Sequence, residues 1–301
     1  MNSFLSTIIS ITVMIILGYI SKRTGLLNNS ETETLNKIVV NIALPSMVFL
    51  AIYNANLSQI NTLGILPLII LIGGLFNALI LYIISKFKKV NTKELWTVIL
   101  VSVCGNTAMV GYPICLGAFG DTGLVSAIFA DLGSLIIFIL MSCFLSIQYE
   151  GEIKDSLKKI FLFPALWALI IGLILNNFNI TLNSTITDIL TYLKDITIPL
   201  IMISLGASLS FRGIKEYYKT IGLTFFLKSL VYPITVLILC FLFNLPTLES
   251  NISIIEAAMP SGMLILTLMT EYKLNLNMGS TCIFINTLLS LIAIPILVGI
   301  L

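Results

Sequence analysis

Ten apolar stretches, each about as long as a helix that crosses a lipid bilayer, constrain this chain more than any other feature of its sequence. A spanning helix needs about 20 mostly apolar residues. The stretches cover residues 3–21, 36–54, 63–85, 95–117, 122–147, 160–177, 186–210, 218–243, 251–271 and 276–300. Charged residues make up only 10% of the chain, whereas a soluble domain carries about 25%. The sequence therefore predicts an all-α polytopic membrane protein with ten transmembrane helices.

The positions of lysine and arginine predict which way these helices cross the bilayer. Short cytoplasmic loops of membrane proteins collect Lys and Arg. Of the 16 Lys and Arg residues, all but Lys194 and Lys228 fall in the odd-numbered loops. The odd-numbered loops hold Lys22, Arg23, Lys37, Lys86, Lys88, Lys89, Lys93, Lys154, Lys158, Lys159, Arg212, Lys215, Lys219 and Lys273. We therefore expect a multi-pass protein of the cell membrane with both termini on the extracytoplasmic side.

Several classes of function find no support in the sequence. The chain has no histidine, which excludes His-based catalytic triads and HExxH zinc sites. Its five cysteines lie in apolar stretches without a CxxC pair, so we expect small buried residues and no metal site. Acidic and basic residues nearly cancel, and this balance gives no argument for a nucleic-acid partner. We expect neither an enzyme nor a bound organic cofactor.

The ten predicted helices divide into two halves of five. The first half is residues 1–147, a cytoplasmic linker is residues 148–159, and the second half is residues 160–301. Because five is an odd number, the second half must cross the membrane in the opposite sense. Prolines recur in the second and fourth helices of each half, at Pro45, Pro113, Pro199 and Pro260. The pattern predicts a 5+5 inverted repeat.

The fourth and ninth helices carry the features of interrupted helices. In the fourth, Gly105 and Gly111 bracket Asn106 and Thr107 just before Pro113. In the ninth, the break and the polar group coincide in Pro260-Ser261-Gly262. A proline inside a helix frees a carbonyl, which in a membrane must be buried in protein or line a wet cavity. Interrupted helices at matching positions of two inverted halves indicate the midplane binding site of a transporter.

These two segments resemble the auxin efflux carrier family, which includes plant auxin exporters and bacterial organic-acid permeases. The run Asn106-Thr-Ala-Met-Val-Gly111-Tyr-Pro113 is similar to the family's Asn-Thr…Gly-x-Pro signature. Residues 256–275 are similar to its ninth-helix pattern of Ala-Ala-x-Pro-x-Gly followed by Glu-Tyr, and the run from Pro199 to Leu209 is also similar. The resemblance covers the whole chain in order.

The resemblance implies an elevator-like secondary transporter of the malate-permease type, related in fold to the sodium–bile-acid symporters. Helices four and nine would cross at their interruptions within a mobile domain, and other helices would form a scaffold that is often dimeric. The substrate would be an organic anion held by its carboxylate at the crossing. The chain lacks the long hydrophilic central loop of the plant members, so neither auxin as cargo nor phosphorylation of such a loop follows from the resemblance.

Free amide groups at the ends of half-helices suit a carboxylate without any arginine. We therefore expect substrate contacts from the interruptions themselves and from polar side chains beside them. The candidate substrate-binding residues are Asn106, Thr107, Gly111, Tyr112, Pro113, Asp131, Pro260, Ser261 and Gly262.

Ionisable residues inside the membrane are the candidates for ion coupling, because a charge at mid-bilayer costs at least about 2.5–3.5 kcal/mol. Glu256, Asp195 and Asn41 each lie four residues before a proline, beside the carbonyl that the proline frees. Such a place suits Na⁺, and a carboxylate there is equally suited to carry a proton. Asp131 is a further acidic candidate, and Lys228 is placed to neutralise one of the acids. The alternative role for these residues is a structural hydrogen bond or ion pair.

Two questions stay open at the level of sequence. An anion channel or a membrane receptor on the same ten-helix frame is the alternative to a carrier. The cargo can be a dicarboxylate such as malate, a monocarboxylate or an auxin-like aromatic acid. The expected partners are this small organic acid, the lipid bilayer and, by resemblance, a second copy of the chain.

Overall fold

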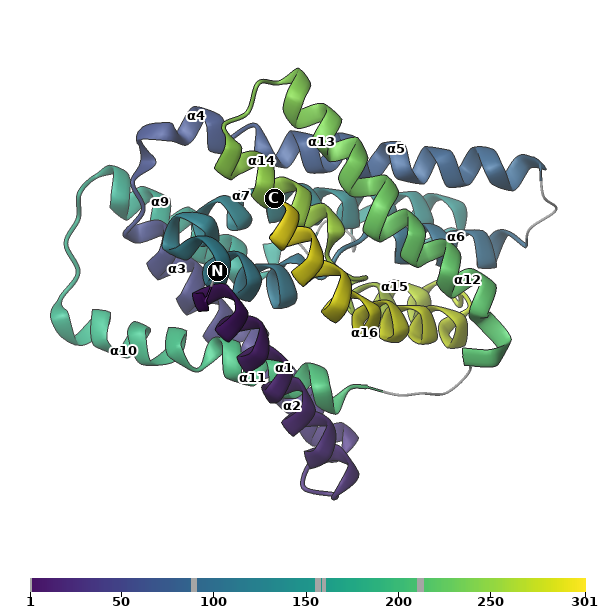
Figure 1. The fold of residues 1–301 in the computed structure, drawn as a ribbon, viewed down its shortest axis with the longest axis horizontal. Helices are drawn as coiled ribbons and strands as arrows, with labels where there is room; N and C mark the ends of the chain where they lie inside the picture. Colours follow the sequence, from purple (N-terminus) through teal and green to yellow (C-terminus); the bar gives the residue numbers. More distant parts are fainter. Residues whose placement is uncertain (1, 88–90, 155–157, 159–160, 210–213) are drawn as a thin grey trace. The chain divides into compact units, whose positions relative to one another are not determined.

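The computed structural model describes residues 2–87, 91–154, 158, 161–209 and 214–301 (Figure 1). The described residues form helices joined by short connections, and no strand occurs among them. Their only extended pairing is an isolated antiparallel bridge between Gly105 and Ser261. The all-helical class predicted from the sequence is therefore confirmed.

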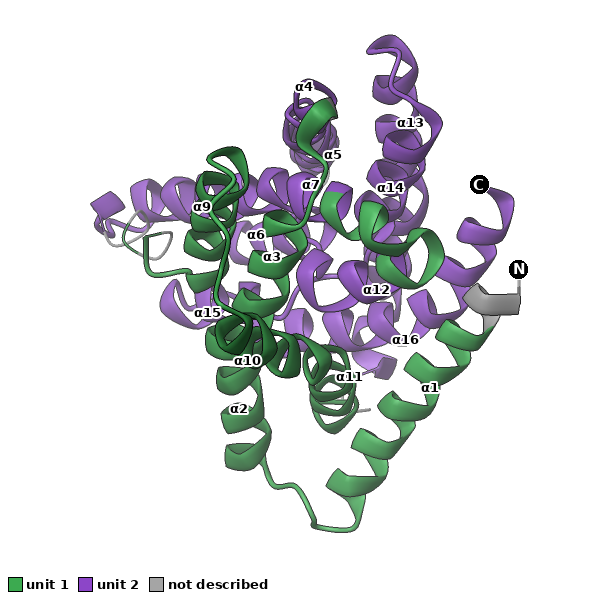
Figure 2. Cartoon of the chain, turned by 90° about the vertical axis from the view of Figure 1, so that its left-hand side faces the viewer, with its two compact units in different colours: residues 1–58, 116–125, 158–209 green, residues 59–115, 126–157, 210–301 purple. Residues whose placement is uncertain are grey.

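The chain divides into two compact units, coloured separately in Figure 2. Unit 1 comprises residues 1–58, 116–125 and 158–209, and unit 2 comprises residues 59–115, 126–157 and 210–301. Each unit thus draws on both halves of the sequence. The inverted repeat itself, with its boundaries at residues 147 and 160, stays a prediction.

Unit 1 is built from pairs of closely packed helices. Its elements are α1 (Asn2–Arg23), α2 (Asn29–Ile38), the π-helical segment η1 (Val39–Ala43), α3 (Leu44–Tyr53), α9 (Pro164–Asn177), α10 (Ser184–Asp195) and α11 (Thr197–Ala207). Helix α1 packs against α11, where Gly18 faces the backbone of Ile203 and Gly206 faces the backbone of Ile15. Small residues at such contacts let helix backbones approach closely, which is typical of helix packing in membranes.

Unit 2 contains the two interrupted segments. Its elements are α4 (Ile60–Leu63), α5 (Leu66–Phe87), α6 (Thr92–Val103), η3 (Thr107–Gly111), most of α7 (Tyr112–Gln148), α12 (Ile214–Phe226), η4 (Leu227–Val231), α13 (Tyr232–Leu242), α14 (Thr247–Ala258), α15 (Ile265–Glu271) and α16 (Leu276–Ile300). A short 3₁₀ turn, η2 (Leu57–Gln59), joins the two units. Helix α7 is kinked at Gly120, whose φ of 68° is in the left-handed region. This kink lies between the predicted fourth and fifth helices.

Seven helical segments among the described residues are long and apolar enough to cross a membrane. They are Ser6–Arg23, Asn29–Tyr53, Ile60–Phe87, Thr107–Gln148, Ser184–Ala207, Ile214–Leu242 and Leu276–Ile300. The three remaining stretches of the sequence prediction give shorter helices. Helix α9 has 14 residues, and α6 and α14 have 12 each because the chain becomes extended after them. The count of ten transmembrane helices therefore stays a prediction. The structure gives seven candidate spans because two of the predicted helices are interrupted and α9 is short.

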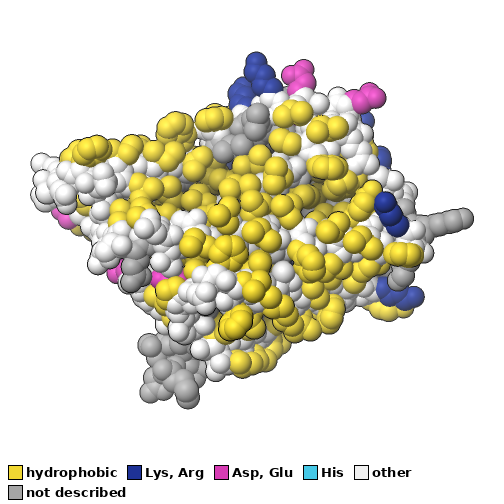
Figure 3. Space-filling view, turned by 90° about the horizontal axis from the view of Figure 1, so that it is seen from above, with side chains coloured by type: hydrophobic (Ala, Val, Ile, Leu, Met, Phe, Trp, Pro, Cys, Tyr) yellow, Lys and Arg dark blue, Asp and Glu magenta, His cyan; other side chains and the backbone are white. Residues whose placement is uncertain are grey.

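Apolar side chains cover much of the face drawn in Figure 3. Phe241 is 80% exposed, Ile292 67% and Phe144 58%. Apolar surface of this extent is unfavourable in water and is suited to lipid. The chain is therefore a multi-pass membrane protein.

Two details differ from the sequence-based topology. The second helical segment begins at Asn29, seven residues before the predicted start, because Asn28 and Glu31 form a capping box. Lys37 consequently lies within α2, where it pairs with Glu33 at 2.8 Å, and not in a loop. Lys88, Lys89, Lys159 and Arg212 lie outside the described residues.

Candidate functional site

The first interruption follows α6 and comprises Cys104, Gly105 and Asn106. Helix α6 ends because Cys104 has an extended backbone, with φ −81° and ψ 113°. Asn106 is also non-helical, and the π-helical segment η3 begins at the next residue. Helix α7 then starts at Tyr112, whose amide still donates to the carbonyl of Thr107 in η3, and Pro113 is its second residue.

The second interruption follows α14 and comprises residues 259–264. Met259 has an extended backbone, with φ −56° and ψ 143°, and α15 does not begin until Ile265. Pro260, Ser261 and Gly262 lie at its centre and are all buried. Both interruptions thus lie where the sequence predicts them, at Gly105–Asn106 and at Pro260–Gly262.

The two interruptions meet through their backbones. The amide of Asn106 donates to the carbonyl of Pro260 at 2.7 Å, and the amide of Gly262 donates to the carbonyl of Cys104 at 3.0 Å. These bonds flank the bridge between Gly105 and Ser261. A Cβ at position 262 would lie 2.7 Å from the carbonyl oxygen of Gly105, so only glycine fits there.

Ser261 satisfies one of the carbonyls that α6 leaves free at its end. The Ser261 hydroxyl is fully buried and donates to the carbonyl of Val101 at 2.6 Å. The last four carbonyls of a helix have no partner within the helix. Ser261 therefore fastens the second interruption to the end of α6, and its hydroxyl proton is already engaged.

The Lys228 ammonium group lies against the first interruption. Lys228 belongs to η4 and is only 2% exposed. Its Nζ donates to the carbonyl of Val103 at 3.3 Å and lies 4.5 Å from the centre of the Tyr232 ring. A Cβ at Gly105 would come within 3.1 Å of this Nζ. Among the described residues, no carboxylate comes within the 4.0 Å of an ion pair with Lys228.

Asn106 has an amide group without a hydrogen-bonding partner. The side chain is 6% exposed, and its Nδ2 finds no acceptor among the described residues. An unsatisfied buried amide of this kind costs about 1–3 kcal/mol. Both Nδ2 protons are consequently free to bind an acceptor that comes from outside the chain.

Asp131 is held by two hydroxyl groups from the other end of the first interruption. The Thr107 hydroxyl donates to its Oδ1, and the Tyr112 hydroxyl donates to its Oδ2 at 2.8 Å. Thr107 and Tyr112 are buried, whereas Asp131, in α7, is partly buried. Asp131 therefore fixes η3 and the start of α7, and its carboxylate lies beside the interruption.

Glu256 lies on the last turn of α14 and is 1% exposed. Its carboxylate occupies the space above Gly111, where a Cβ would overlap both oxygens. The thiol of Cys115 contacts Oε1 at 3.5 Å, and Oε2 has no partner among the described residues. One oxygen of a fully buried carboxylate is thus available to a proton or a cation.

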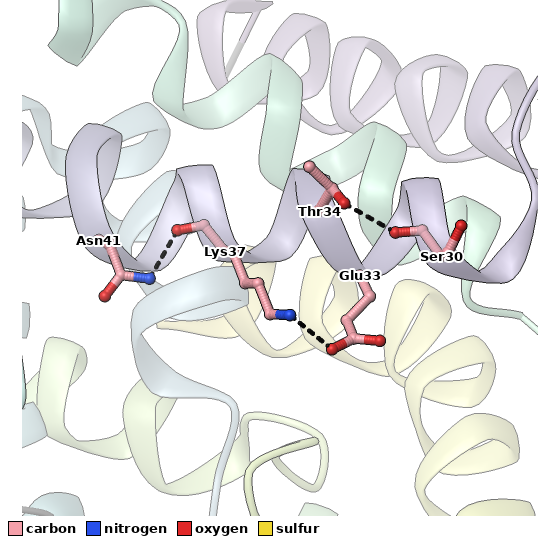
Figure 4. Close-up of polar contacts among 5 residues, drawn as sticks. All are labelled: Ser30, Glu33, Thr34, Lys37 and Asn41. Atoms are coloured by element: carbon pink, nitrogen blue, oxygen red, sulfur yellow. Dashed lines mark hydrogen bonds and ion pairs between the residues drawn. The ribbon is translucent and has the colours of Figure 1, made fainter.

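The spacing to a proline that singles out Glu256 also predicts Asn41 and Asp195, but both of these residues belong to unit 1. Both side chains are exposed. The Asn41 Nδ2 donates to the carbonyl of Lys37 at 2.8 Å, a local helical contact that Figure 4 shows beside the Lys37–Glu33 pair. Asp195 is the last residue of α10. Neither residue is part of unit 2, and their role in ion coupling stays a prediction.

The cluster also contains groups that the sequence analysis did not single out. Cys115 gives no signal that separates it from the other buried cysteines, and the carbonyls of Val101 and Val103 become acceptors only where α6 stops. No group of three Cys, Asp or Glu side chains among the described residues could hold a metal ion.

The comparisons with known proteins agree with this architecture. The family model described as "Membrane transport protein" matches residues 3–158 and 152–298. An uncharacterized transporter of Methanocaldococcus jannaschii is 37% identical over 300 residues, which cover 97% of each chain. One of Methanothermobacter thermautotrophicus is 35% identical over 290 residues, 96% of each chain. The uncharacterized transporter YfdV of Escherichia coli is 21% identical over 304 residues, 97% of this chain and 96% of its own.

The match extends over nearly the whole chain and includes both interruptions. The chain therefore belongs to the membrane transport protein family, which is the family of the auxin efflux carriers.

Proposed function

We propose that the protein is a secondary transporter that binds a small organic anion by its carboxylate where the two interruptions meet. The observation that carries this proposal is that two buried donor groups border the first interruption, one cationic and one neutral. The buried Lys228 ammonium has no carboxylate partner, and the buried Asn106 amide has no acceptor, among the described residues. We call these two groups the anion site.

The energetic argument favours an anion over a neutral or cationic substrate. A buried charge without a partner costs several kcal/mol after relaxation. A carboxylate bound between the ammonium and the amide would remove that cost and accept charge-assisted hydrogen bonds. Small organic acids fit this requirement, whether they carry one carboxylate or two.

Transport by alternating access would use unit 2 as the moving part. All residues of the anion site and both interruptions belong to unit 2, so the site would move with it as one body. Unit 1 would then be the scaffold, and a second copy of the chain would pair with it. Helices four and nine would cross at the Gly105–Ser261 bridge, within a 5+5 inverted repeat. Both termini would face the extracytoplasmic side of the cell membrane.

Coupling to an ion gradient would use the acidic residues beside the site. Glu256 has one free carboxylate oxygen, and Asp131 lies on the other side of the first interruption. Either a proton or Na⁺ would neutralise charge when the substrate leaves. No organic cofactor is needed for such a cycle.

Counterflow in proteoliposomes tests the proposal. Vesicles loaded with unlabelled malate, lactate or indole-3-acetate should take up the same radiolabelled acid saturably for at least one of the three. Lys228→Met and Asn106→Ala should each reduce this uptake by about tenfold or more, because each removes a donor worth about 1.5–3 kcal/mol to a charged acceptor. Lys215→Met, which changes an exposed lysine, is the control.

Two results would contradict the proposal. Absence of counterflow for all three acids would remove the carrier function, and a substrate-independent conductance that does not saturate would favour a channel. Uptake by Lys228→Met at the wild-type rate would instead remove Lys228 from the anion site and leave the carrier in place.

A further inference from the structure

Helix α14 carries three buried oxygen atoms without a partner on one face. They are Oε2 of Glu249, Oγ of Ser253 and Oε2 of Glu256. The three residues are 4%, 0% and 1% exposed. Native proteins leave only a few such atoms per 100 residues, and each calls for an explanation such as water or an ion. Three such unpartnered oxygen atoms lie within eight residues of α14, so this face of the helix in particular calls for an explanation.

Their spacing places the three side chains in a line. An α-helix has 3.6 residues per turn and rises 1.5 Å per residue. Glu249 and Glu256 are seven residues apart, almost two turns, and Ser253 lies between them on the same face. The line is therefore about 10 Å long, with successive groups separated by about 4.5–6 Å along the axis. One water molecule between neighbouring groups would bridge each gap with ordinary hydrogen bonds.

The line runs from the first turn of α14 to its last turn. Glu249 lies in the first turn of α14, two residues after the exposed Thr247, and the partly buried Leu248 lies between them. Glu256 lies in the last turn, where its carboxylate contacts Cys115 beside Gly111. The loop before Glu249 contains no Lys or Arg, which predicts an extracytoplasmic position.

Ser253 shows that this face is not explained by local helix geometry. Serine hydroxyls in helices commonly bond a carbonyl of the preceding turn. Ser290 and Ser46, for example, donate to Thr287 and Ile42 at 2.7 and 2.9 Å. The Ser253 hydroxyl makes no such bond, and its polar neighbour is the Cys240 thiol, a weak partner.

We infer that the Glu249–Ser253–Glu256 face of α14 is a proton path between the outer end of the helix and the coupling carboxylate beside the anion site. The inference rests on the proposed function and identifies the proton as its coupling ion. A proton that enters at the Glu249 carboxylate passes through water to the Ser253 oxygen, and the serine gives its own proton onward to Glu256. One proton is transferred, no electron is exchanged, and Ser253 ends unchanged.

The groups around the inner end of the path suit this role. Asp131, Tyr112 and Cys115 face Glu256 from α7, Lys228 faces it from η4, and Tyr232 faces it from α13. No carboxylate–ammonium contact within 4.0 Å engages Glu256 among the described residues. A proton arriving there therefore changes the charge next to Lys228, and with it the affinity of the anion site.

The experiment compares two modes of transport in the same proteoliposomes, with malate, lactate and indole-3-acetate as probes. Counterflow exchanges substrate without net proton movement, whereas uptake driven by an imposed pH gradient requires proton entry. Ser253→Ala and Glu249→Gln should each reduce gradient-driven uptake by about a hundredfold or more, the lower end of what one proton-transfer group contributes. Counterflow should stay within about twofold of wild type, because neither residue contacts the anion site.

Matched variants keep the test independent of folding. Ser290→Ala removes an equally buried hydroxyl from α16 that already has an acceptor, and it should leave both modes unchanged. Ser253→Thr keeps the hydroxyl and should restore gradient-driven uptake.

The outcomes separate the two proposals. If wild type shows counterflow but no response to the pH gradient, or if Ser253→Ala and Glu249→Gln keep the full response, the proton path is wrong and the carrier stands. If wild type shows no counterflow with any probe, the proposed function fails and the path fails with it.

Discussion

Gly111 is the residue at which the two interrupted segments leave least room. A methyl group at this position would overlap the Glu256 carboxylate. We expect Gly111→Ala to lower the free energy of unfolding by about 1–3 kcal/mol, the usual cost of overpacking a core. Thermal melting of the purified protein in detergent measures this change.

The chain supplies a control for this substitution. Gly222 is helical, in α12, and nothing lies within 4 Å of a Cβ built there. Gly222→Ala should be neutral or stabilising by up to about 1 kcal/mol, because alanine is the better helix former. If Gly111→Ala melted at or above the wild-type temperature, Glu256 would not occupy the space that the structure gives it.

The contacts of Asp131 give a second prediction for single residues. Tyr112→Phe removes the hydroxyl that donates to Oδ2, and we expect a loss of about 1–3 kcal/mol in unfolding free energy. Asp131→Asn should cost a similar amount. In the double variant the two losses should not add, because they remove the same interaction. Additive losses, measured by thermal melting, would mean that the hydroxyl and the carboxylate do not interact.

Sequence reasoning finds the interruptions, because prolines and glycines dictate where the helices break. Asn106 and Ser261 lie beside glycines and a proline, and the structure brings their backbones to the point where the interruptions meet. The same reasoning has no means of assigning a residue to a unit, so Asn41 and Asp195 appear equivalent to Glu256. Glu249 and Ser253 carry a usable signal, namely their placement on the face of Glu256, but only burial shows that their oxygens lack partners.

At the scale of elements, three π-helical segments end two residues before a proline. They are Val39–Ala43 before Pro45, Thr107–Gly111 before Pro113, and Leu227–Val231 before Pro233. In each, the residue before the proline donates to the carbonyl five residues earlier, as Tyr232 does to Leu227. The wider turn accommodates a ring that would otherwise clash with a carbonyl. A proline in the sequence predicts that the helix is disturbed there, but it does not predict that the disturbance is a π-helical turn.

The segment η4 therefore sets the direction of Lys228, and this can be tested. Pro233→Ala removes the reason for the wide turn, and a regular α-helix would rotate Lys228 by up to about 100° relative to α13. We expect counterflow to fall by about tenfold while the melting temperature stays equal or rises, because a helical hydrogen bond is regained. Pro295→Ala regains a bond inside α16, away from any π-helical segment, and should leave counterflow unchanged. Wild-type counterflow by Pro233→Ala would show that η4 does not depend on its proline.

At the scale of the whole molecule, the sequence predicts the apolar stretches, whereas the structure shows how these stretches are grouped into units. Hydropathy gives the number and order of apolar stretches, and the structure divides the same chain into two units that each take segments from both halves. This interleaving is not visible in hydropathy, because it depends on which apolar faces pack together. For orientation in the membrane, in contrast, we expect the lysine and arginine distribution to decide, and the fold does not change that distribution.

Lysine and arginine are concentrated in the odd-numbered loops, which predicts that these loops are cytoplasmic. Measuring the side of the membrane on which each loop or terminus lies therefore tests the predicted topology. With ten crossings, both ends of the chain must lie on the same side, and the cations place that side outside. Alkaline phosphatase, which is active only outside the cytoplasm, should be active when fused after Leu301 and inactive when fused after Lys154. Green fluorescent protein, which matures only in the cytoplasm, should give the opposite result at the two positions. Two results would contradict this topology: the same side reported at both fusion sites, or inactive phosphatase after Leu301. Either result would mean that one of the shorter helices, α6, α9 or α14 with its continuation, does not cross the bilayer. The two halves would then no longer be inverted relative to each other.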